Sequence, residues 1–482
     1  MTDRNAIHVP GTARTFDRRR ILFVLLLAMA MSLMAVSSVN VALPTIEEGL
    51  GASPSDIQWV LSGYALALGV TLIPAGRAGD VLGRGSLFCV GMAVFVVASL
   101  ACGLAGSPLA LNAARLVQGL GAGLYSPQVT GMIQQYFSGG GRARAFALLG
   151  LVVAASVAVG PVLSGAIIEA VGPTSGWRWT FFTYLPVGLA GIVLAWRWFP
   201  FETERTRRAT AGPDRRRVDL DPVGTTLATL TVLGLMYPFM ARAAWAWLLL
   251  PLALGLGFGW TRWERRYAAR GGEPLIDLDL FAYRSFRNGI AVSGAVFLGV
   301  TSTFVVVALF LQSGLGVGAL AAGLIGLPNA ILSGWAAIWT VRFVMEHGRR
   351  LVVVAISVMI GATLLSLVVG WLIGAAGISF WWLAAPLALI GLGMGTLGSA
   401  NQTLSMQDIP PAHGGAASGL KQTVERTATA MGNAAITGVF FLTVGLADWA
   451  DAFIAAFAAV TVCLTGALLL AVLDLRQHRA TR

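Results

Sequence analysis

Long apolar stretches separated by short polar segments run along almost the whole chain. A helix needs about 20 apolar residues to cross the hydrocarbon core of a membrane, and windows of that length recur throughout the sequence. These windows lie at about 20–44, 57–76, 86–105, 108–136, 145–169, 179–199, 222–241, 243–261, 289–312, 319–341, 351–373, 380–404, 416–443 and 451–473. The pattern predicts an all-α integral membrane protein with fourteen transmembrane helices.

The composition supports this interpretation. Hydrophobic residues make up 56% of the 482 residues and charged residues only 11%, whereas a soluble domain has about 25% charged residues. So little charge cannot cover a water-exposed body, which excludes cytosolic enzymes, nucleic-acid-binding proteins and disulfide scaffolds. The three cysteines all lie within apolar windows, and an odd number in such places indicates neither a disulfide framework nor a metal site.

The basic residues are distributed asymmetrically between the two sides of the predicted membrane protein. If the N-terminus is cytoplasmic, the outward-facing gaps carry only Arg178 and Arg242, and nearly all other basic residues lie at the inner side. This bias predicts that both termini are cytoplasmic, and we expect the cell (inner) membrane. The first window is too long for a signal peptide and lacks a small-residue cleavage site after it, so we expect it to be retained as the first helix.

Two longer basic inner segments divide the windows into groups of six, two and six. We expect a cytoplasmic tail at 1–19, a six-helix bundle at 20–199, a basic linker at 200–221, two extra central helices at 222–261, a cytoplasmic loop at 262–288, a second six-helix bundle at 289–473 and a tail at 474–482. Two six-helix halves are typical of transporters with a site between structural repeats. The basic segments could bind anionic lipid head groups; the alternative is that their charge only sets the topology.

Several short motifs carry a family resemblance. Residues 76–85 read GRAGDVLGRG, in which glycines permit a tight turn and Asp80 can pair with Arg84 or with neighbouring helix ends. In this position the segment resembles the loop signature of the major facilitator superfamily. Other segments are similar to motifs of the fourteen-span drug:proton antiporters of that superfamily. They are NVALP at 40–44, RLVQGLGAG at 115–123, the set Gly150, Gly160, Pro161 and Gly165, WRW at 177–179, WERR at 263–266 and PLID at 274–277.

The resemblance implies roles for two of these motifs. Gly76, Asp80, Gly83 and Arg84 would form an inner latch that closes and opens as the halves move, although an ordinary capped turn remains an alternative. The resemblance also implies that Gly150, Gly160, Pro161 and Gly165 form the antiporter-motif helix. Pro161 would bend it, because proline removes an intrahelical hydrogen bond; the alternative is a kink with no role in coupling.

Arg115 is a candidate for proton or charge coupling. It lies about 10 Å inside the fourth window by helical rise, and a charge at that depth is costly and suggests a functional role. In the family that the chain resembles, the equivalent arginine is linked to proton transfer. The alternative is a structural arginine whose donors are satisfied by backbone carbonyl groups.

The first half departs from the family pattern. The family's first span usually carries an aspartate five residues before the asparagine, where this chain has Ala35. Proton antiport needs a group that binds and releases a proton, usually a desolvated carboxylate. The best remaining candidate is Glu425 in the thirteenth window, with Lys421 four residues earlier on the same helix face. The alternative is an ion pair at the cytoplasmic mouth.

The second half repeats the inner signature only weakly. Residues 342–350 read RFVMEHGRR, with Met345 at the position of the acidic residue. His347 has an ordinary pKa near neutrality, but its loop position predicts a solvated side chain.

Candidate substrate-cavity residues are polar or aromatic side chains of the first half: Asn40, Trp59, Tyr64, Tyr125 and Gln128. Ordinary packing is the alternative for each. Apolar walls with a few polar groups suit a hydrophobic or amphipathic solute, and the lack of first-half acids disfavours a strongly cationic one.

These observations predict a secondary active exporter of hydrophobic or amphipathic small molecules that works by alternating access and proton antiport. The expected partners are the substrate, protons and membrane lipids, with no nucleic acid, and we expect a monomer. The sequence shows no nucleophile with a base, no metal-ligand spacing and no phosphate loop, so we expect no enzyme, cofactor or metal. The alternatives are a lipid or metabolite exporter without proton coupling, and a non-transporting membrane scaffold or sensor.

Overall fold

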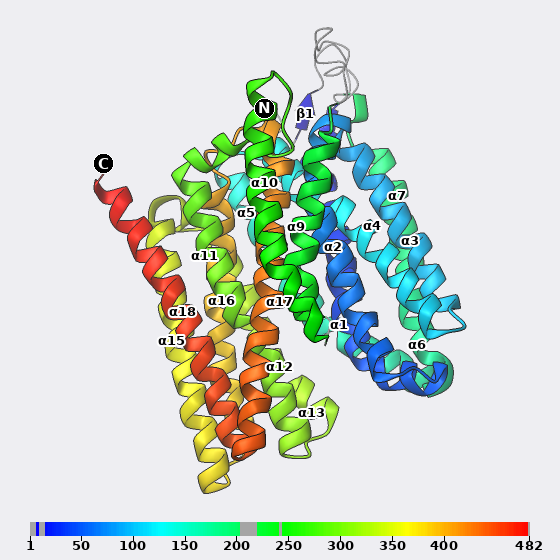
Figure 1. Cartoon of the computed structure of the whole chain (residues 1–482), viewed down its shortest axis with the longest axis vertical. Coiled ribbons are helices and arrows are strands. Elements are labelled where there is room, and N and C mark those ends of the chain that lie inside the picture. The colour runs from blue at the N-terminus through cyan, green and yellow to red at the C-terminus, as the bar shows by residue number, and fades with distance from the viewer. Residues whose placement is uncertain (1–5, 9–14, 203–218, 241–242, 481–482) are drawn as a thin grey trace. The chain divides into compact units, whose positions relative to one another are not determined.

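The computed structural model describes residues 6–8, 15–202, 219–240 and 243–480, most of them in helices (Figure 1). The elements of the N-terminal part are β1 (Ala6–His8), β2 (Thr15–Asp17), α1 (Arg18–Leu50), α2 (Pro54–Leu82), α3 (Arg84–Leu104), α4 (Pro108–Tyr136), α5 (Gly139–Val171), α6 (Pro173–Phe182) and α7 (Tyr184–Trp198). The next are α9 (Pro222–Met240), η2 (Ala244–Leu248), α10 (Leu249–Ala269) and η3 (Leu278–Ala282). Most of the predicted basic linker lies outside the described residues.

The C-terminal part is also helical. Its elements are α11 (Arg284–Val300), α12 (Ser302–Leu309), the π-helix η4 (Phe310–Gly314), α13 (Ala319–Leu324), α14 (Leu327–Thr340), α15 (Val344–Ala376), η5 (Phe380–Leu383), α16 (Ala384–Ser405), η6 (Pro411–His413), α17 (Gly414–Leu446) and α18 (Trp449–Ala480). The two short strands β1 and β2 pair antiparallel ahead of α1.

Polar residues set the starts of several helices. Asp17 accepts a hydrogen bond from the backbone of Arg19 at the start of α1. Ser53 and Asp56 form a capping box at the start of α2, in which each side chain accepts from the other residue's backbone N–H. Such caps satisfy N–H groups that have no partner within the helix.

The chain forms two compact units. Unit 1 comprises 1–138, 159–280 and 409–423, and unit 2 comprises 139–158, 281–408 and 424–482. Helices α5 and α17 therefore each contribute one part to each unit.

Glycines on α4 allow the helices of unit 1 to pack closely. A Cβ atom on Gly119 would lie 2.4 Å from the carbonyl oxygen of Tyr64 on α2, and one on Gly121 would lie 2.6 Å from the backbone nitrogen of Phe95 on α3. No side chain fits at either position. Helix α4 thus packs against α2 on one face and α3 on another, as small residues permit in membrane helices.

Twelve helices among the described residues are long and apolar enough to cross a membrane, which identifies a multi-pass membrane protein. Two of the fourteen predicted spans, 108–136 and 243–261, form α4 and α10 without being among these twelve. Helix α4 carries several buried polar side chains, because other helices enclose much of it and reduce its contact with lipid. The apolar part of α10 is short, because it begins only at Leu249 and ends in the WERR segment.

Helix α9 packs against α10 on one side and against α2 on the other, all within unit 1 (Figure 1). Near one end, the side chain of Gln58 donates to the carbonyl of Met240, and the ring centroids of Trp59 and Tyr237 are 5.9 Å apart. At the other end of α2, Arg77 forms an ion pair with Glu273, in the segment after α10. The α9–α10 pair is therefore attached near both ends of α2.

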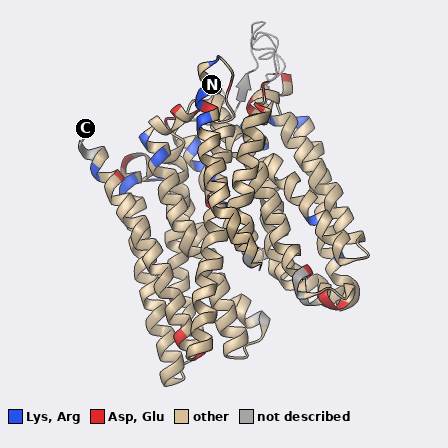
Figure 2. Cartoon of the chain, viewed as in Figure 1, with Lys and Arg blue, Asp and Glu red and all other residues tan. Residues whose placement is uncertain are grey.

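Basic side chains gather at one end of the helices in each unit (Figure 2). In unit 1 this end holds the start of α1 and the α2–α3 connection, whereas Glu47 and Glu48 lie at the far end of α1. In unit 2 the basic end includes the end of α18, and Asp448 and Asp451 lie at its other end. The segregation within each unit agrees with the charge bias in the sequence.

Close backbone approach also organises unit 2. A Cβ atom on Gly391 of α16 would lie 2.1 Å from the carbonyl oxygen of Asn329 on α14, and one on Gly395 would lie 1.9 Å from that of Ser333. Aromatic rings fill the space on another side, where the centroids of Phe310 and Phe453 are 4.7 Å apart.

We predict that Gly395→Ala destabilises the protein, because its methyl group would overlap the Ser333 carbonyl. Overpacking of this kind typically costs about 1–3 kcal/mol. Gly398→Ala on the same helix is the matched control, because nothing lies within 4 Å of its Cβ position. Thermal unfolding of the purified variants in detergent should show a lower Tm for Gly395→Ala only. Equal Tm values would contradict the packing argument.

Candidate functional site: a latch at the start of α17 and a buried arginine network

The residues of the predicted latch meet the start of α17 within unit 1. Arg84 donates to Oδ1 of Asp80 through Nε at 2.9 Å and Nη2 at 2.6 Å, and both side chains are 4% exposed. Asp80 also accepts hydrogen bonds from the backbone N–H groups of Gly415 at 3.1 Å and Ala416 at 2.9 Å. A carboxylate is favourable there, because the first N–H groups of a helix lack partners within it and carry partial positive charge.

Arg84 holds a wider set of backbone groups at the same place. Its Nη1 donates to the carbonyl of Gly131 at 2.7 Å, and its Nη2 donates to that of Pro411 at 2.6 Å. Gln134 of α4 adds a hydrogen bond from Nε2 to the carbonyl of Ile409 at 2.8 Å. The segment that leads into α17 is therefore bound to α2, α3 and α4 through side chains that bond its main chain.

Glycines make this contact possible. A Cβ atom on Gly76 would lie 2.4 Å from the carbonyl oxygen of Gly415, and one on Gly415 would lie 2.5 Å from Oδ1 of Asp80. Gly83 has φ +97° between α2 and α3, a backbone conformation that side chains disfavour. The four predicted latch residues thus come together, and the structure adds Gly415 and Ala416.

Arg115 is completely buried in unit 1 and bonds to three neighbouring helix positions. Its Nε donates to the carbonyl of Val60 at 2.9 Å, and its Nη1 donates to the carbonyl of Ala35 at 3.2 Å and to Oε1 of Gln118 at 2.6 Å. The guanidinium also lies over the Tyr64 ring, 4.4 Å from its centroid, a cation–π contact.

This network continues to α3. Gln118 donates through Nε2 to the hydroxyl of Ser99 at 2.7 Å. The motif at 115–123 contains Gln118, but sequence reasoning gave it no role and missed Ser99. An arginine with a glutamine three residues later on one helix face was the signal available.

The substrate-cavity candidates take different positions. Tyr64, Tyr125 and Gln128 are buried. Tyr64 shares a hydrogen bond with the Ser32 hydroxyl, whereas Gln128 donates to the carbonyl of Ala75 at 2.8 Å. These contacts lie inside unit 1.

The two remaining candidates are less enclosed. Asn40 is exposed and donates to the Val36 carbonyl of its own helix at 3.4 Å, and Trp59 packs against Tyr237 of α9. A role in substrate contact stays a prediction for all five.

The antiporter-motif residues lie on α5, which remains helical through Pro161. In unit 1, a Cβ atom on Gly160 would lie 2.1 Å from the Ser37 hydroxyl of α1. In unit 2, one on Gly150 would lie 3.3 Å from Cβ of Ala337 on α14. Gly165 is less restricted, since its nearest contact, with Val41, would be 3.9 Å.

Lys421 and Glu425 occupy successive turns of α17. Lys421 is 5% exposed and belongs to unit 1, whereas Glu425 is half-buried and belongs to unit 2. The boundary between the units thus falls between the two proposed charges.

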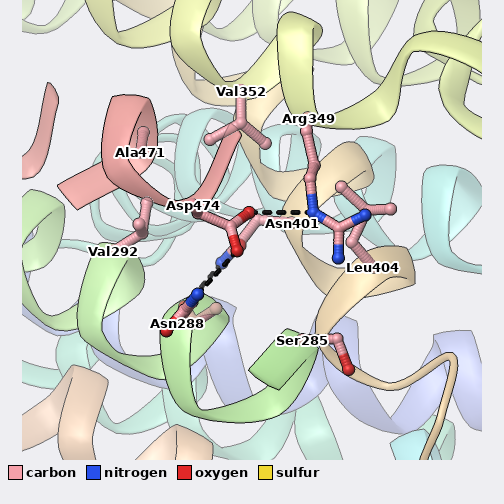
Figure 3. A pocket seen from close by; sticks show the side chains of 10 residues that line it. Ser285, Asn288, Val292, Arg349, Val352, Asn401, Leu404, Ala471 and Asp474 are labelled. Carbon is pink, nitrogen blue, oxygen red and sulfur yellow. Dashed lines mark hydrogen bonds and ion pairs between the residues drawn. The ribbon is translucent and has the colours of Figure 1, made fainter. Parts of the chain in front are cut away.

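In unit 2, the weak repeat of the inner signature has a polar partner that the sequence did not predict. Asp474 of α18 accepts hydrogen bonds from Nδ2 of Asn288 at 2.7 Å and from Nε of Arg349 at 3.0 Å (Figure 3). Met345 is 62% exposed, and the His347 side chain is 48% exposed. Arg349 therefore finds its carboxylate on another helix. Within the described part of the chain, no group of three His, Cys, Asp or Glu residues could hold a metal ion.

Comparison with known proteins gives the family. The sequence profile described as Major Facilitator Superfamily matches residues 25–433. The chain belongs to the major facilitator superfamily. This membership makes it a transporter rather than an enzyme.

The superfamily relatives include exporters. The chain is 33% identical to "Probable actinorhodin transporter" of Streptomyces coelicolor over 450 residues, which cover 91% of this chain and 75% of that protein. It is 30% identical to "Cephamycin export protein CmcT" of Amycolatopsis lactamdurans, over 90% of this chain and 88% of that protein. The crystal structure of the human organic anion transporter MFSD10 (TETRAN) has the same fold, with a TM-score of 0.69, 15% identity, and coverage of 94% of this chain and 99% of that one.

We predict that Arg115→Lys destabilises this superfamily member, since an ammonium group cannot reach the Val60 and Ala35 carbonyls and Gln118 in the same geometry. Loss of a hydrogen bond from a buried charged group costs about 2 kcal/mol. Arg144→Lys is the control, because Arg144 is exposed on α5. Thermal unfolding should show a lower Tm for Arg115→Lys alone. An unchanged Tm would mean that these hydrogen bonds contribute little.

Proposed function

We propose that the chain is a secondary active exporter of hydrophobic or amphipathic small molecules, working by alternating access with proton antiport. The observation that carries this proposal is the latch, in which one carboxylate binds Arg84 and the start of α17 together. The bonds from Asp80 to α17 are hydrogen bonds to the first N–H groups of that helix, so this contact can open without breaking a helix. A transporter needs such a contact to close and release its inner side.

The named relatives support export as the direction of transport and small molecules as the substrate class. Two relatives that match most of this chain are named for actinorhodin transport and cephamycin export. On that basis we propose that this chain also transports small antibiotic-like solutes. The low number of buried acids in the first half fits uncharged or weakly charged substrates. The two-bundle organisation with two extra helices, a fourteen-span topology, cytoplasmic termini, the cell (inner) membrane and a monomeric state belong to the same proposal.

For proton coupling, Glu425 with Lys421 and Arg115 are the proposed groups. Arg115 would act through Gln118 and the α1 and α2 backbones, because its guanidinium already has these partners. Glu425 is the carboxylate that could bind and release the proton, since it is half-buried on α17. Lys421 lies one turn earlier on the same helix.

The second candidate is a lipid or metabolite exporter without proton coupling. Ala35 favours it, because this position holds an aspartate in the proton antiporters that the chain resembles. Ala35 is completely buried and its carbonyl accepts from Arg115, so the backbone here provides the acceptor that a side chain would otherwise supply.

Asp80→Asn tests the latch. The amide keeps the size of the side chain but removes the charge that favours the α17 N-terminus, an interaction of about 1 kcal/mol, or roughly fivefold in an equilibrium. We expect export of a fluorescent amphipathic dye from cells to fall about fivefold or more, at equal amounts of protein in the membrane.

Asp279→Asn, an exposed aspartate in the inner loop, is the matched control and should export normally. Normal export by Asp80→Asn would exclude the latch from the transport cycle. Loss of export together with loss of protein would indicate a folding role instead.

Proteoliposomes test the coupling. Cephamycin or actinorhodin serves as the probe. When an inward-directed proton gradient is imposed, outward flux of the probe should rise. This response should disappear in Glu425→Gln. The exposed Glu346 provides the control Glu346→Gln, which should respond like the unmodified protein. Flux that continues but ignores the pH gradient would contradict antiport and support the uncoupled exporter.

A further inference from the structure

Two carboxyl groups are buried together where the α9–α10 pair meets the inner loop of unit 1. Asp221 is 0% exposed and Glu264 is 1% exposed. Asp221 directly precedes α9, and its Oδ1 accepts from the Gly224 N–H and from Nε1 of Trp263, both at 2.9 Å. Glu264 lies in the last turns of α10, beyond its apolar part, and its Oε1 accepts from Nε1 of Trp260.

One oxygen of each carboxyl group lacks a hydrogen-bond partner: Oδ2 of Asp221 and Oε2 of Glu264. The two groups are close to each other. A Cβ atom built on Gly224 would lie 2.0 Å from Oδ2 of Asp221 and 2.8 Å from Oε1 of Glu264. The distance between these two oxygens is therefore at most the sum of those two distances. Two ionised carboxylates this close, with unpartnered oxygens, would be strongly unfavourable.

The neighbouring charged groups Asp219 and Arg77 bond to residues other than Asp221 and Glu264. On the loop before α9, Asp219 accepts from the hydroxyl of Tyr267 and from the Glu273 N–H. Arg77 of α2 forms its ion pair with Glu273. Helix α9 carries no acidic or basic residue. The remaining charged residues of α10 and the following segment are Arg262, Arg265, Arg266, Arg270, Asp277 and Asp279, of which the four arginines and Asp279 are exposed. None of them has a hydrogen bond to either carboxyl group among the described contacts.

The carboxyl groups of Asp221 and Glu264 have different surroundings. The pKa of Glu264 is raised from 4.5 to about 7, mainly by burial and in addition by the neighbouring Asp221, against the opposite effect of Trp260 and of the backbone N–H groups of Ile276 and Leu275. Asp221 occupies an N-cap position, where its Oδ1 already accepts from the N–H of Gly224 and from Trp263. We therefore place the shared proton on Glu264.

We propose that Asp221 and Glu264 form a proton-binding site in which the protonated Glu264 carboxyl donates to the unpartnered Oδ2 of Asp221. One proton satisfies the unpartnered Asp221 oxygen and removes one of the two negative charges. A metal ion does not fit, because the other groups around the pair are indole and peptide N–H donors, which cannot act as ligands.

Deprotonation would weaken the junction between the α9–α10 pair and the inner loop. Folding raises the pKa of the buried Glu264, so the stability that the site contributes is greatest in acid and decreases as the pH rises through about 7. The segment that covers Glu264, at Leu275 and Ile276, continues back to Glu273 and its ion pair with Arg77.

Infrared difference spectroscopy of the full-length protein in lipid nanodiscs tests the site directly, without a transport assay. A protonated carboxylic acid has a C=O band that an ionised carboxylate lacks. In the unmodified protein we expect this band to disappear with a midpoint at about 7, and Glu264→Gln should lack the transition. Asp221→Asn keeps an N-cap side chain but removes the negative charge, so the midpoint should fall by about one pH unit.

Glu346→Gln, which removes an exposed glutamate, is the control and should leave the band unchanged. Size-exclusion chromatography confirms that each variant remains folded. The proposal is overturned if the midpoint lies at the ordinary glutamate value of 4.5 or if Glu264→Gln retains the transition. An unchanged midpoint in Asp221→Asn would overturn the shared site, and a midpoint that falls when Na⁺ or Mg²⁺ is added would show a cation site instead.

Discussion

A charged side chain enclosed among membrane helices must find partners for all of its charge within the protein, because lipid supplies none. Two buried charges in the described part of unit 1, Arg115 and Asp80, show how this constraint is met. Arg115 satisfies it with two backbone carbonyls and an amide side chain from three helices. In doing so it connects α4 to α1 and α2, so the cost of burying the charge is offset by bonds that position the helices.

Asp80 satisfies the same constraint in a different way. Its partners are Arg84 and two N–H groups at the start of α17, and these partners come from segments more than 300 residues apart in sequence. Bonds to a helix end depend on main-chain atoms, so they require close backbone approach. Gly76 and Gly415 provide it, which explains why glycine accompanies the charges in this motif.

Much of this could be predicted from the sequence. The apolar window at 351–373 lies within α15 and that at 86–105 nearly coincides with α3, because both helices need apolar surface over their full length. Gly76, Asp80, Gly83 and Arg84 could be selected because their residue types and spacing have a physical use in a tight inner turn. Their partners Gly415 and Ala416 could not, because no local pattern indicates which distant helix end a carboxylate will cap.

The same limit applies to Glu264. Within a WERR segment it looks like a solvated charge, and its burial depends on Asp221, forty-three residues earlier in the chain, and on the backbone at 275–276, which folds over it. The window at 108–136 correctly predicted a helix, α4, but not that its polar side chains are buried among neighbouring helices. Burial by tertiary packing is the information that the linear pattern lacks.

Helix α2 connects the two polar junctions of unit 1. Arg77 bonds to the segment after α10, and Asp80, three residues later, bonds to the start of α17. Because three residues span less than one helical turn, the two contacts share the same end of the same helix. A shift of that end large enough to release Asp80 from α17 must also change the geometry of the Arg77–Glu273 ion pair. The segment after α10 is therefore mechanically connected, through Glu273 and α2, to the contact between Asp80 and the start of α17.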